Sequence, residues 1–220
     1  MFRTVSIAGF IITITGIVLH YMIFGPKLDD LFGRDRRWRI LDGFRMMVFL
    51  LTLLLLPQKV NFIGIVRKLV YLFALLCFVV LAVTGFFPRL VLDKTIYGYW
   101  LMIHATFAPV FAVCLGILAV MWADNCRFDK NYCPWLQKLL EREPLNPIVG
   151  GKLELAQKIF FWLIIFLALP LILSIVLSMF SFFGTDAQGL LLNLHRYIAL
   201  VLALSIIVHI YLLILGRMKQ

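Results

Sequence analysis

The sequence predicts an all-α protein, a bundle of transmembrane helices, and three observations support this fold class. Hydrophobic residues make up 63% of the 220 residues and the mean hydropathy is +1.01, whereas a soluble domain is about 45–50% apolar. Five apolar runs reach the ~20 residues that a helix needs to cross the hydrocarbon core. Lys and Arg number 21 against 11 acidic residues. They lie mostly between the apolar runs, which indicates loops kept in the cytoplasm rather than nucleic-acid binding.

Each apolar run is expected to form one membrane helix. The expected helices are Val5–Phe24, Leu69–Phe87, Tyr97–Trp122, Ile159–Phe183 and Leu190–Gly216. The first follows Arg3, as a signal peptide would, but it is longer than a typical signal core and no small-residue cleavage site follows it. We therefore expect it to be retained. Tyr97 and Trp122 bound the third helix at headgroup level, and Pro170 predicts a kink in the fourth.

One segment between the first two helices leaves the number of spans at five or six. The apolar part of residues 40–57, Met46–Leu56, is shorter than a span. If this segment does not cross, 17 of the 21 basic residues lie on one side of the membrane, whereas a crossing would divide them 12 to 9. The positive-inside rule favours five spans, with the N-terminus outside and the C-terminus in the cytoplasm.

The chain divides into an N-terminal extension, residues 1–66, and a four-helix domain, residues 67–220. The longest polar loop after the third helix contains Cys126 and Cys133, which could form a disulfide or a redox pair. No Cys-x-x-Cys motif occurs, so zinc, iron–sulfur and c-type haem attachment all lack their usual spacing.

The chain has only four histidines, His20, His104, His195 and His209, and each lies within an expected membrane helix. Ionisable residues at such positions are costly and therefore suggest a function. His195 and His209 are 14 residues apart on one helix, which places them about 40° apart around the helix and ~21 Å apart along it. This stripe suits two stacked haems, one in each leaflet.

Depth in the membrane predicts how the histidines pair. His104 and His195 lie near the outer ends of their helices, and in the five-span arrangement His20 and His209 both lie near the inner surface. A pair of neutral imidazoles can hold a haem iron from both faces. The alternative is histidines that hydrogen-bond to neighbouring helices. Arg196 could pair with a haem propionate or extend to the interface as an ordinary snorkelling arginine.

Four segments carry a resemblance to a known family. The last helix reads LHRYIALVLALSIIVHIYL, the helix before it begins QKIFFW, and the two preceding helices contain LMIHATFAPVF and RKLVYLFALLCFVVLAVTGFF. Together they resemble the cytochrome b subunit of respiratory formate dehydrogenases and nickel–iron hydrogenases. Where that family usually has an inner-haem histidine, this sequence has Val70. Carried over, the outer haem keeps His104 and His195 and the inner haem keeps His209, with His20 proposed as the replacement ligand.

The resemblance also implies a function. It implies an electron-transfer subunit that holds two b haems, or one, rather than a complete enzyme. Menaquinone or ubiquinone would be its substrate, and its partner would be an iron–sulfur or multihaem cytochrome c protein. The location would be a bacterial-type inner membrane. The alternatives are a haem-free membrane anchor or transporter component and a single-haem membrane cytochrome.

Overall fold

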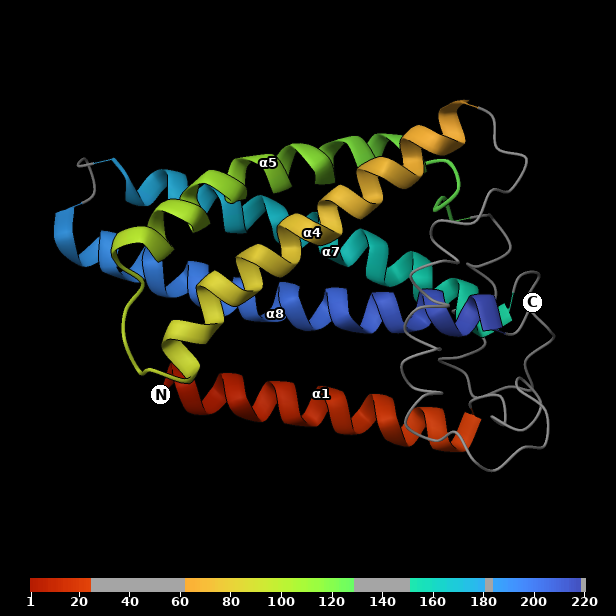
Figure 1. The fold of residues 1–220 in the computed structure, drawn as a ribbon, viewed down its shortest axis with the longest axis horizontal. Helices are drawn as coiled ribbons and strands as arrows, with labels where there is room; N and C mark the ends of the chain where they lie inside the picture. The colour runs from red at the N-terminus through yellow and green to blue at the C-terminus, as the bar shows by residue number, and fades with distance from the viewer. Residues whose placement is uncertain (25–61, 129–150, 181–183, 219–220) are drawn as a thin grey trace.

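The computed structural model describes residues 1–24, 62–128, 151–180 and 184–218, and these form five α-helices without any β-strand (Figure 1). The helices are α1 (Phe2–Phe24), α4 (Phe62–Leu90), α5 (Gly98–Trp122), α7 (Gly151–Ser178) and α8 (Gly184–Met218). All five are long and apolar enough to cross a membrane. The predicted all-α transmembrane bundle is confirmed, whereas residues 40–57 and Cys133 lie outside the described residues.

Local sequence explains where the helices begin and why they continue past the apolar runs. α5 and α8 both start at a glycine with a positive φ, +58° at Gly98 and +70° at Gly184, a conformation that costs glycine little. α7 starts before its apolar run, in a turn that holds an ion pair of 2.9 Å between Lys158 and Glu154. Pro170 lies inside α7, where neighbouring helices compensate for the lost hydrogen bond.

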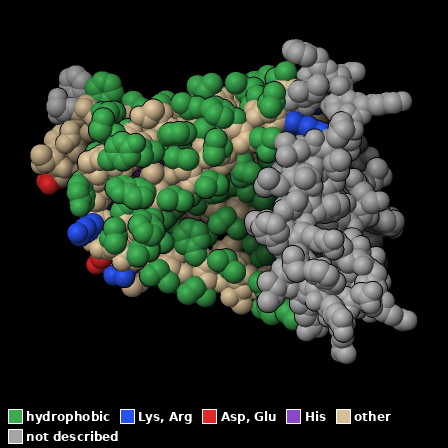
Figure 2. Space-filling model, viewed as in Figure 1, with side chains coloured by type: hydrophobic (Ala, Val, Ile, Leu, Met, Phe, Trp, Pro, Cys, Tyr) green, Lys and Arg blue, Asp and Glu red, His purple; other side chains and the backbone are tan. Residues whose placement is uncertain are grey.

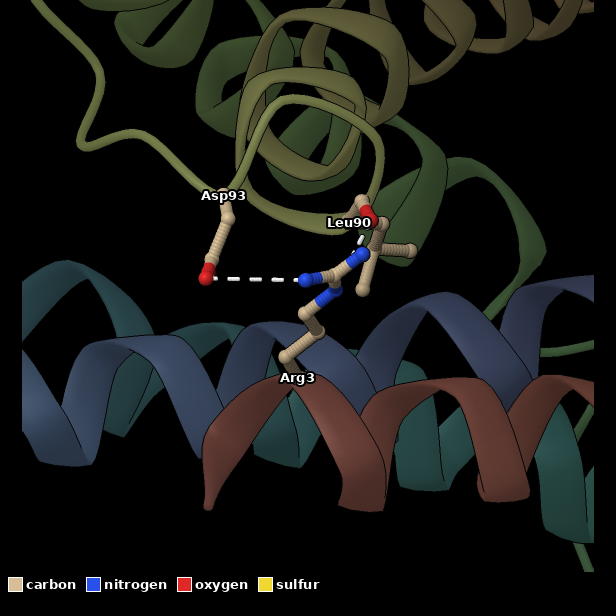
Figure 3. Close-up of polar contacts among 3 residues, drawn as sticks. All are labelled: Arg3, Leu90 and Asp93. Carbon is tan, nitrogen blue, oxygen red and sulfur yellow. Dashed lines mark hydrogen bonds and ion pairs between the residues drawn. The ribbon is translucent and has the colours of Figure 1, made fainter.

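Two contacts fix the direction of α1. At its start, Arg3 donates a hydrogen bond of 3.1 Å to the carbonyl oxygen of Leu90 and lies 3.5 Å from the carboxylate of Asp93, just beyond α4 (Figure 3). Near its end, His20 contacts Tyr211 near the end of α8. α1 therefore runs antiparallel to α4 and parallel to α8, which are the directions that the five-span prediction requires (Figure 1).

The core lies among the four later helices. The closest neighbours are α7 with α8 and α4 with α5. Small and apolar side chains of all four helices meet in one buried cluster that includes Cys77, Cys114, Ala168 and Leu202. Helix α1 packs mainly against α8 and α4, so it lies beside this core rather than within it.

The outer surface suits a lipid environment. Many large apolar side chains are exposed on every helix, and Figure 2 shows hydrophobic side chains over most of the described face, with charged ones near its ends. In water such a surface would be a large apolar patch. Lipid chains can cover it at no such cost, so the surface agrees with a protein that spans the membrane.

Candidate functional site

His104 on α5 is held by a hydroxyl group on α4. Its Nδ1 lies 3.0 Å from Oγ1 of buried Thr84, and that hydroxyl donates its hydrogen to the carbonyl oxygen of Val80 at 2.7 Å. A hydroxyl has one hydrogen, so Thr84 accepts the bond from His104. The proton of the neutral ring is therefore on Nδ1, and Nε2 carries the lone pair.

His195 on α8 is held in the same way by α7. Its Nδ1 lies 3.1 Å from the carbonyl oxygen of Leu171 and 3.3 Å from Oγ of buried Ser174, which itself donates to Leu171 at 2.8 Å. A carbonyl oxygen only accepts, so Nδ1 is again the donor. Both histidines thus have the same tautomer, with Nε2 left as the atom able to bind a metal.

The structure brings these two imidazoles near each other. They lie close enough to interact electrostatically, although they belong to different helix pairs. A histidine that binds a metal usually donates its other N–H to a carbonyl or hydroxyl group, and both rings meet that requirement. The donor set therefore fits a haem, whose macrocycle supplies the other four nitrogen ligands of the iron.

A different kind of metal centre has less support. In the described ranges, no group of three or more His, Cys, Asp or Glu residues could hold a metal ion. A structural zinc site uses four protein ligands and a catalytic one three. Two imidazoles are sufficient only where another molecule completes the coordination sphere, as a porphyrin does.

Gly85 gives His104 its space. A Cβ atom at Gly85 would lie 3.2 Å from Cε1 of the His104 ring, whereas a Cβ at Gly116 would meet nothing within 4 Å. The two glycines therefore differ in their surroundings. Gly85 admits the imidazole itself, and Gly116 lies on an exposed part of α5.

His209 lies on the same stripe of α8 as His195. Because α8 is one continuous helix, the 14-residue spacing places them about 40° apart and ~21 Å apart along it. The Nδ1 atom of His209 is buried and has no hydrogen-bond partner in the described part of the chain. A buried nitrogen without a partner is costly, so this position fits a ligand that the chain alone does not supply.

His20 is placed differently from the expectation. Its Nδ1 lies 2.7 Å from the hydroxyl of Tyr211, and the two rings meet edge to face at 5.7 Å. Tyr211 is two residues after His209, or 200° around α8. The structure thus brings His20 to the other side of α8 from His209. Their pairing on one haem stays a prediction, and this arrangement gives it no support.

The remaining predicted positions have ordinary surroundings. Arg196 donates a hydrogen bond of 3.1 Å to Oδ1 of Asn193 on its own helix, and Val70 packs against the core cluster. Burial raises the pKa of the Cys126 thiol, and the nearby Lys158 opposes that rise. The disulfide or redox pair that Cys126 and Cys133 could form lies partly outside the described residues.

Sequence reasoning missed Thr84 and Ser174. Both are hydroxyl residues inside otherwise apolar helices, each about 20 residues before the histidine that it contacts. A search for hydroxyl side chains at the depth of each histidine would have selected them. Which hydroxyl meets which ring depends on helix rotation, which the sequence does not show.

Two known families match parts of the chain. Residues 72–220, more than half of the chain, match the family described as prokaryotic cytochrome b561, and residues 1–30 match the family described as formate dehydrogenase N, transmembrane. No curated protein matches the chain. The two matches confirm the resemblance to a cytochrome b subunit of formate dehydrogenase-type complexes, and the first includes His104, His195 and His209. The chain belongs to the prokaryotic cytochrome b561 family.

Proposed function

We propose that this chain is the membrane cytochrome b subunit of a respiratory redox complex, which carries electrons through b haems between a partner subunit and the quinone pool. The geometry of His104 and His195 carries the proposal. Two helix pairs each present one imidazole whose Nδ1–H is already bonded to the neighbouring helix. The family and the membrane-spanning helices agree with it.

The residues of this site would fix the haem without a flexible ligand. Thr84 and Leu171 orient the two rings, and Gly85 allows the first ring to sit against α4. A haem b held there supplies a one-electron couple between ferric and ferrous iron. Ligands on both faces leave no open position on the iron, which suits electron transfer rather than oxygen chemistry.

A second haem on His209 is part of the proposal. His209 faces the same side of α8 as His195, and no residue of the described ranges bonds to its buried Nδ1 atom. The spacing of ~21 Å along the helix would put one haem near each surface. His20 was predicted as its second ligand, and the alternative is a haem with His209 as its one protein ligand. Two haems per chain are expected in either case.

The partner subunit, the quinone and the membrane are proposed on the same basis. The partner would be an iron–sulfur or multihaem cytochrome c protein, in keeping with the match of residues 1–30 to a formate dehydrogenase transmembrane family. Menaquinone or ubiquinone would exchange electrons at the inner side. The membrane would be a bacterial-type cytoplasmic membrane, with the N-terminus outside and the C-terminus inside, as the distribution of basic residues favours.

Haem content of the purified chain tests the proposal. We expect two b haems per chain by pyridine haemochrome and a reduced-minus-oxidised spectrum of low-spin haem b. His104→Ala and His195→Ala should each remove the same spectral component, since they bind one iron, and His209→Ala should remove the other. His20→Ala should remove the same component as His209→Ala if His20 is the second ligand, and should leave the spectrum intact if His209 is the one protein ligand. Absence of haem from the unmodified chain would refute the cytochrome function and leave a membrane anchor.

A further inference from the structure

Helices α1 and α8 contact each other along a seam, with apolar contacts near the start of α1 and a hydrogen bond near its end. Near the start of α1, Phe2 contacts Tyr197 edge to face at 5.3 Å, and further along Gly9 approaches Leu204. Tyr197, Leu204 and Tyr211 recur every seven residues, which keeps them on one side of α8. At the third level the contact is polar, because His20 bonds to Tyr211.

A third polar group lies at that same level. Tyr21 follows His20 on α1 and is close enough to Tyr211 to interact electrostatically. The hydroxyl of Tyr21 is buried, and no hydrogen-bond partner is found for it in the described ranges. Inside a bilayer no water replaces a missing partner, so an unpaired donor is expensive. An acceptor supplied by another molecule would therefore be stabilised at this hydroxyl.

The surroundings limit the chemistry of that molecule. Leu19, Met22 and Ile23 next to the cluster are exposed on the lipid-facing side of α1, so the approach is through lipid. The ligand must therefore be membrane-soluble. It must also offer an acceptor oxygen to a phenol and a flat surface to aromatic rings. A quinone head group has both features and carries an apolar tail that can remain in the lipid.

We propose that His20, Tyr21 and Tyr211 bind the head group of a membrane quinone in the seam between α1 and α8. This inference rests on the proposed function and gives that function's quinone a location. The Tyr21 hydroxyl donates to a quinone carbonyl oxygen, and the tail leaves between the exposed side chains of α1. Tyr211 is only ~3 Å along α8 from the level of His209, so the head group lies at the depth of the proposed second haem.

The test uses the full chain in phospholipid nanodiscs with an azido-menaquinone photolabel, and labelled peptides are identified by mass spectrometry. Labelling is expected on the peptides that contain Tyr21 and Tyr211, and unlabelled menaquinone-4 should compete with it. Tyr21→Phe should weaken binding about tenfold, the effect of losing one hydrogen bond to a ligand. Tyr197→Phe, on the same seam at a level without His20, is the matched control and should bind normally.

Thermal unfolding separates loss of binding from loss of structure. Removal of an unpaired buried hydroxyl should leave the melting temperature of Tyr21→Phe unchanged or raise it. Labelling confined to other helices, or labelling that added phospholipid displaces and menaquinone-4 does not, would overturn the inference while a normal haem spectrum left the proposed function intact. A chain that lacks haem but labels at Tyr21 would refute the function and still support the quinone site.

Discussion

Hydroxyl groups one helix away decide what His104 and His195 can do. Thr84 and Ser174 each give their single hydrogen to a carbonyl of their own helix, and they therefore meet the imidazole as acceptors. Each ring is turned so that Nδ1 is protonated and Nε2 is available. This control of the tautomer, rather than the presence of a histidine alone, makes the positions suitable as axial ligands.

Thr84→Val tests that control. The valine keeps the shape of threonine but cannot accept from His104, so the imidazole loses both orientation and basicity. We expect haem affinity at this site to fall by about 10- to 100-fold. The midpoint potential of the haem that still binds at this site should rise, because a less basic ligand stabilises ferric iron less. Redox titration of the purified variant measures the change.

Thr106→Val is the matched control for this change. Thr106 also donates to the carbonyl four residues earlier, at 2.8 Å from Met102, but it is exposed and makes no hydrogen bond to a histidine among the described residues. Its haem content and potential should remain normal. Equal effects of both valine substitutions would show that Thr84 acts on helix stability and not on His104.

Gly85→Ala tests the space beside the ring. The added methyl group would lie 3.2 Å from Cε1 of His104, closer than an ordinary van der Waals contact, so the imidazole must shift. We expect reduced haem occupancy and a broadened low-spin signal in electron paramagnetic resonance. Gly116→Ala adds a methyl group in open space and should retain full occupancy. Full occupancy in both variants would contradict the close fit.

At the scale of the helices, a hydrogen bond joins the start of α7 to the end of α8. The side-chain amide of Gln157 donates to the carbonyl oxygen of Leu212 at 2.8 Å. It reaches that oxygen across Gly216, where a Cβ would lie only 2.5 Å from its nitrogen. The glycine thus makes the notch that allows one helix to bond to the backbone of the other.

Gly216→Ala should break this contact. Because the amide must leave Leu212, we expect a loss of about 1 kcal/mol in the free energy of unfolding, the net value of one hydrogen bond. Gly189→Ala on the same helix meets no neighbour and should be neutral or stabilising, since alanine favours a helix more than glycine. Thermal unfolding in detergent compares the two variants. A more stable Gly216→Ala protein would contradict the claim that Gly216 makes room for the Gln157 hydrogen bond.

Polar contacts hold helix α1 near both of its ends. Arg3 joins it to the region after α4, and His20 joins it to α8. The Arg3–Asp93 pair is exposed, with 43% and 59% of the side chains accessible, so its contribution to stability is about 0–1 kcal/mol. The pair instead fixes the alignment of the two helices, because it sets which end of α1 meets which end of α4.

At the scale of the whole molecule, the direction of α1 determines the sidedness of the termini. Residues at its start meet the end of α4, and residues at its end meet the end of α8. The start of α1 and the end of α8 therefore lie at opposite ends of the bundle (Figure 1). We expect reporters fused before Met1 and after Gln220 to give opposite locations in cells. Equal locations would contradict the parallel arrangement of α1 and α8.

The sequence by itself determined the membrane-spanning helices and the depth of the histidines. A run of about 20 apolar residues has few stable forms other than a membrane helix, so the five helices follow from composition and length. The heights of His104 and His195 follow from the constant rise of a helix. The stripe of His195 and His209 depends only on positions within one helix, so it could be predicted without knowledge of any neighbour.

Only the tertiary structure decided which groups meet. Depth gives the height of a residue but not the rotation of its helix about its own axis, and that rotation is set by packing. The contacts Phe2–Tyr197 and Gly9–Leu204 turn α1 toward one side of α8, so His20 meets Tyr211 although its depth also matches His209. The same holds for Thr84 and Ser174, whose contacts with histidines arise between helices and leave no periodic signal in the sequence.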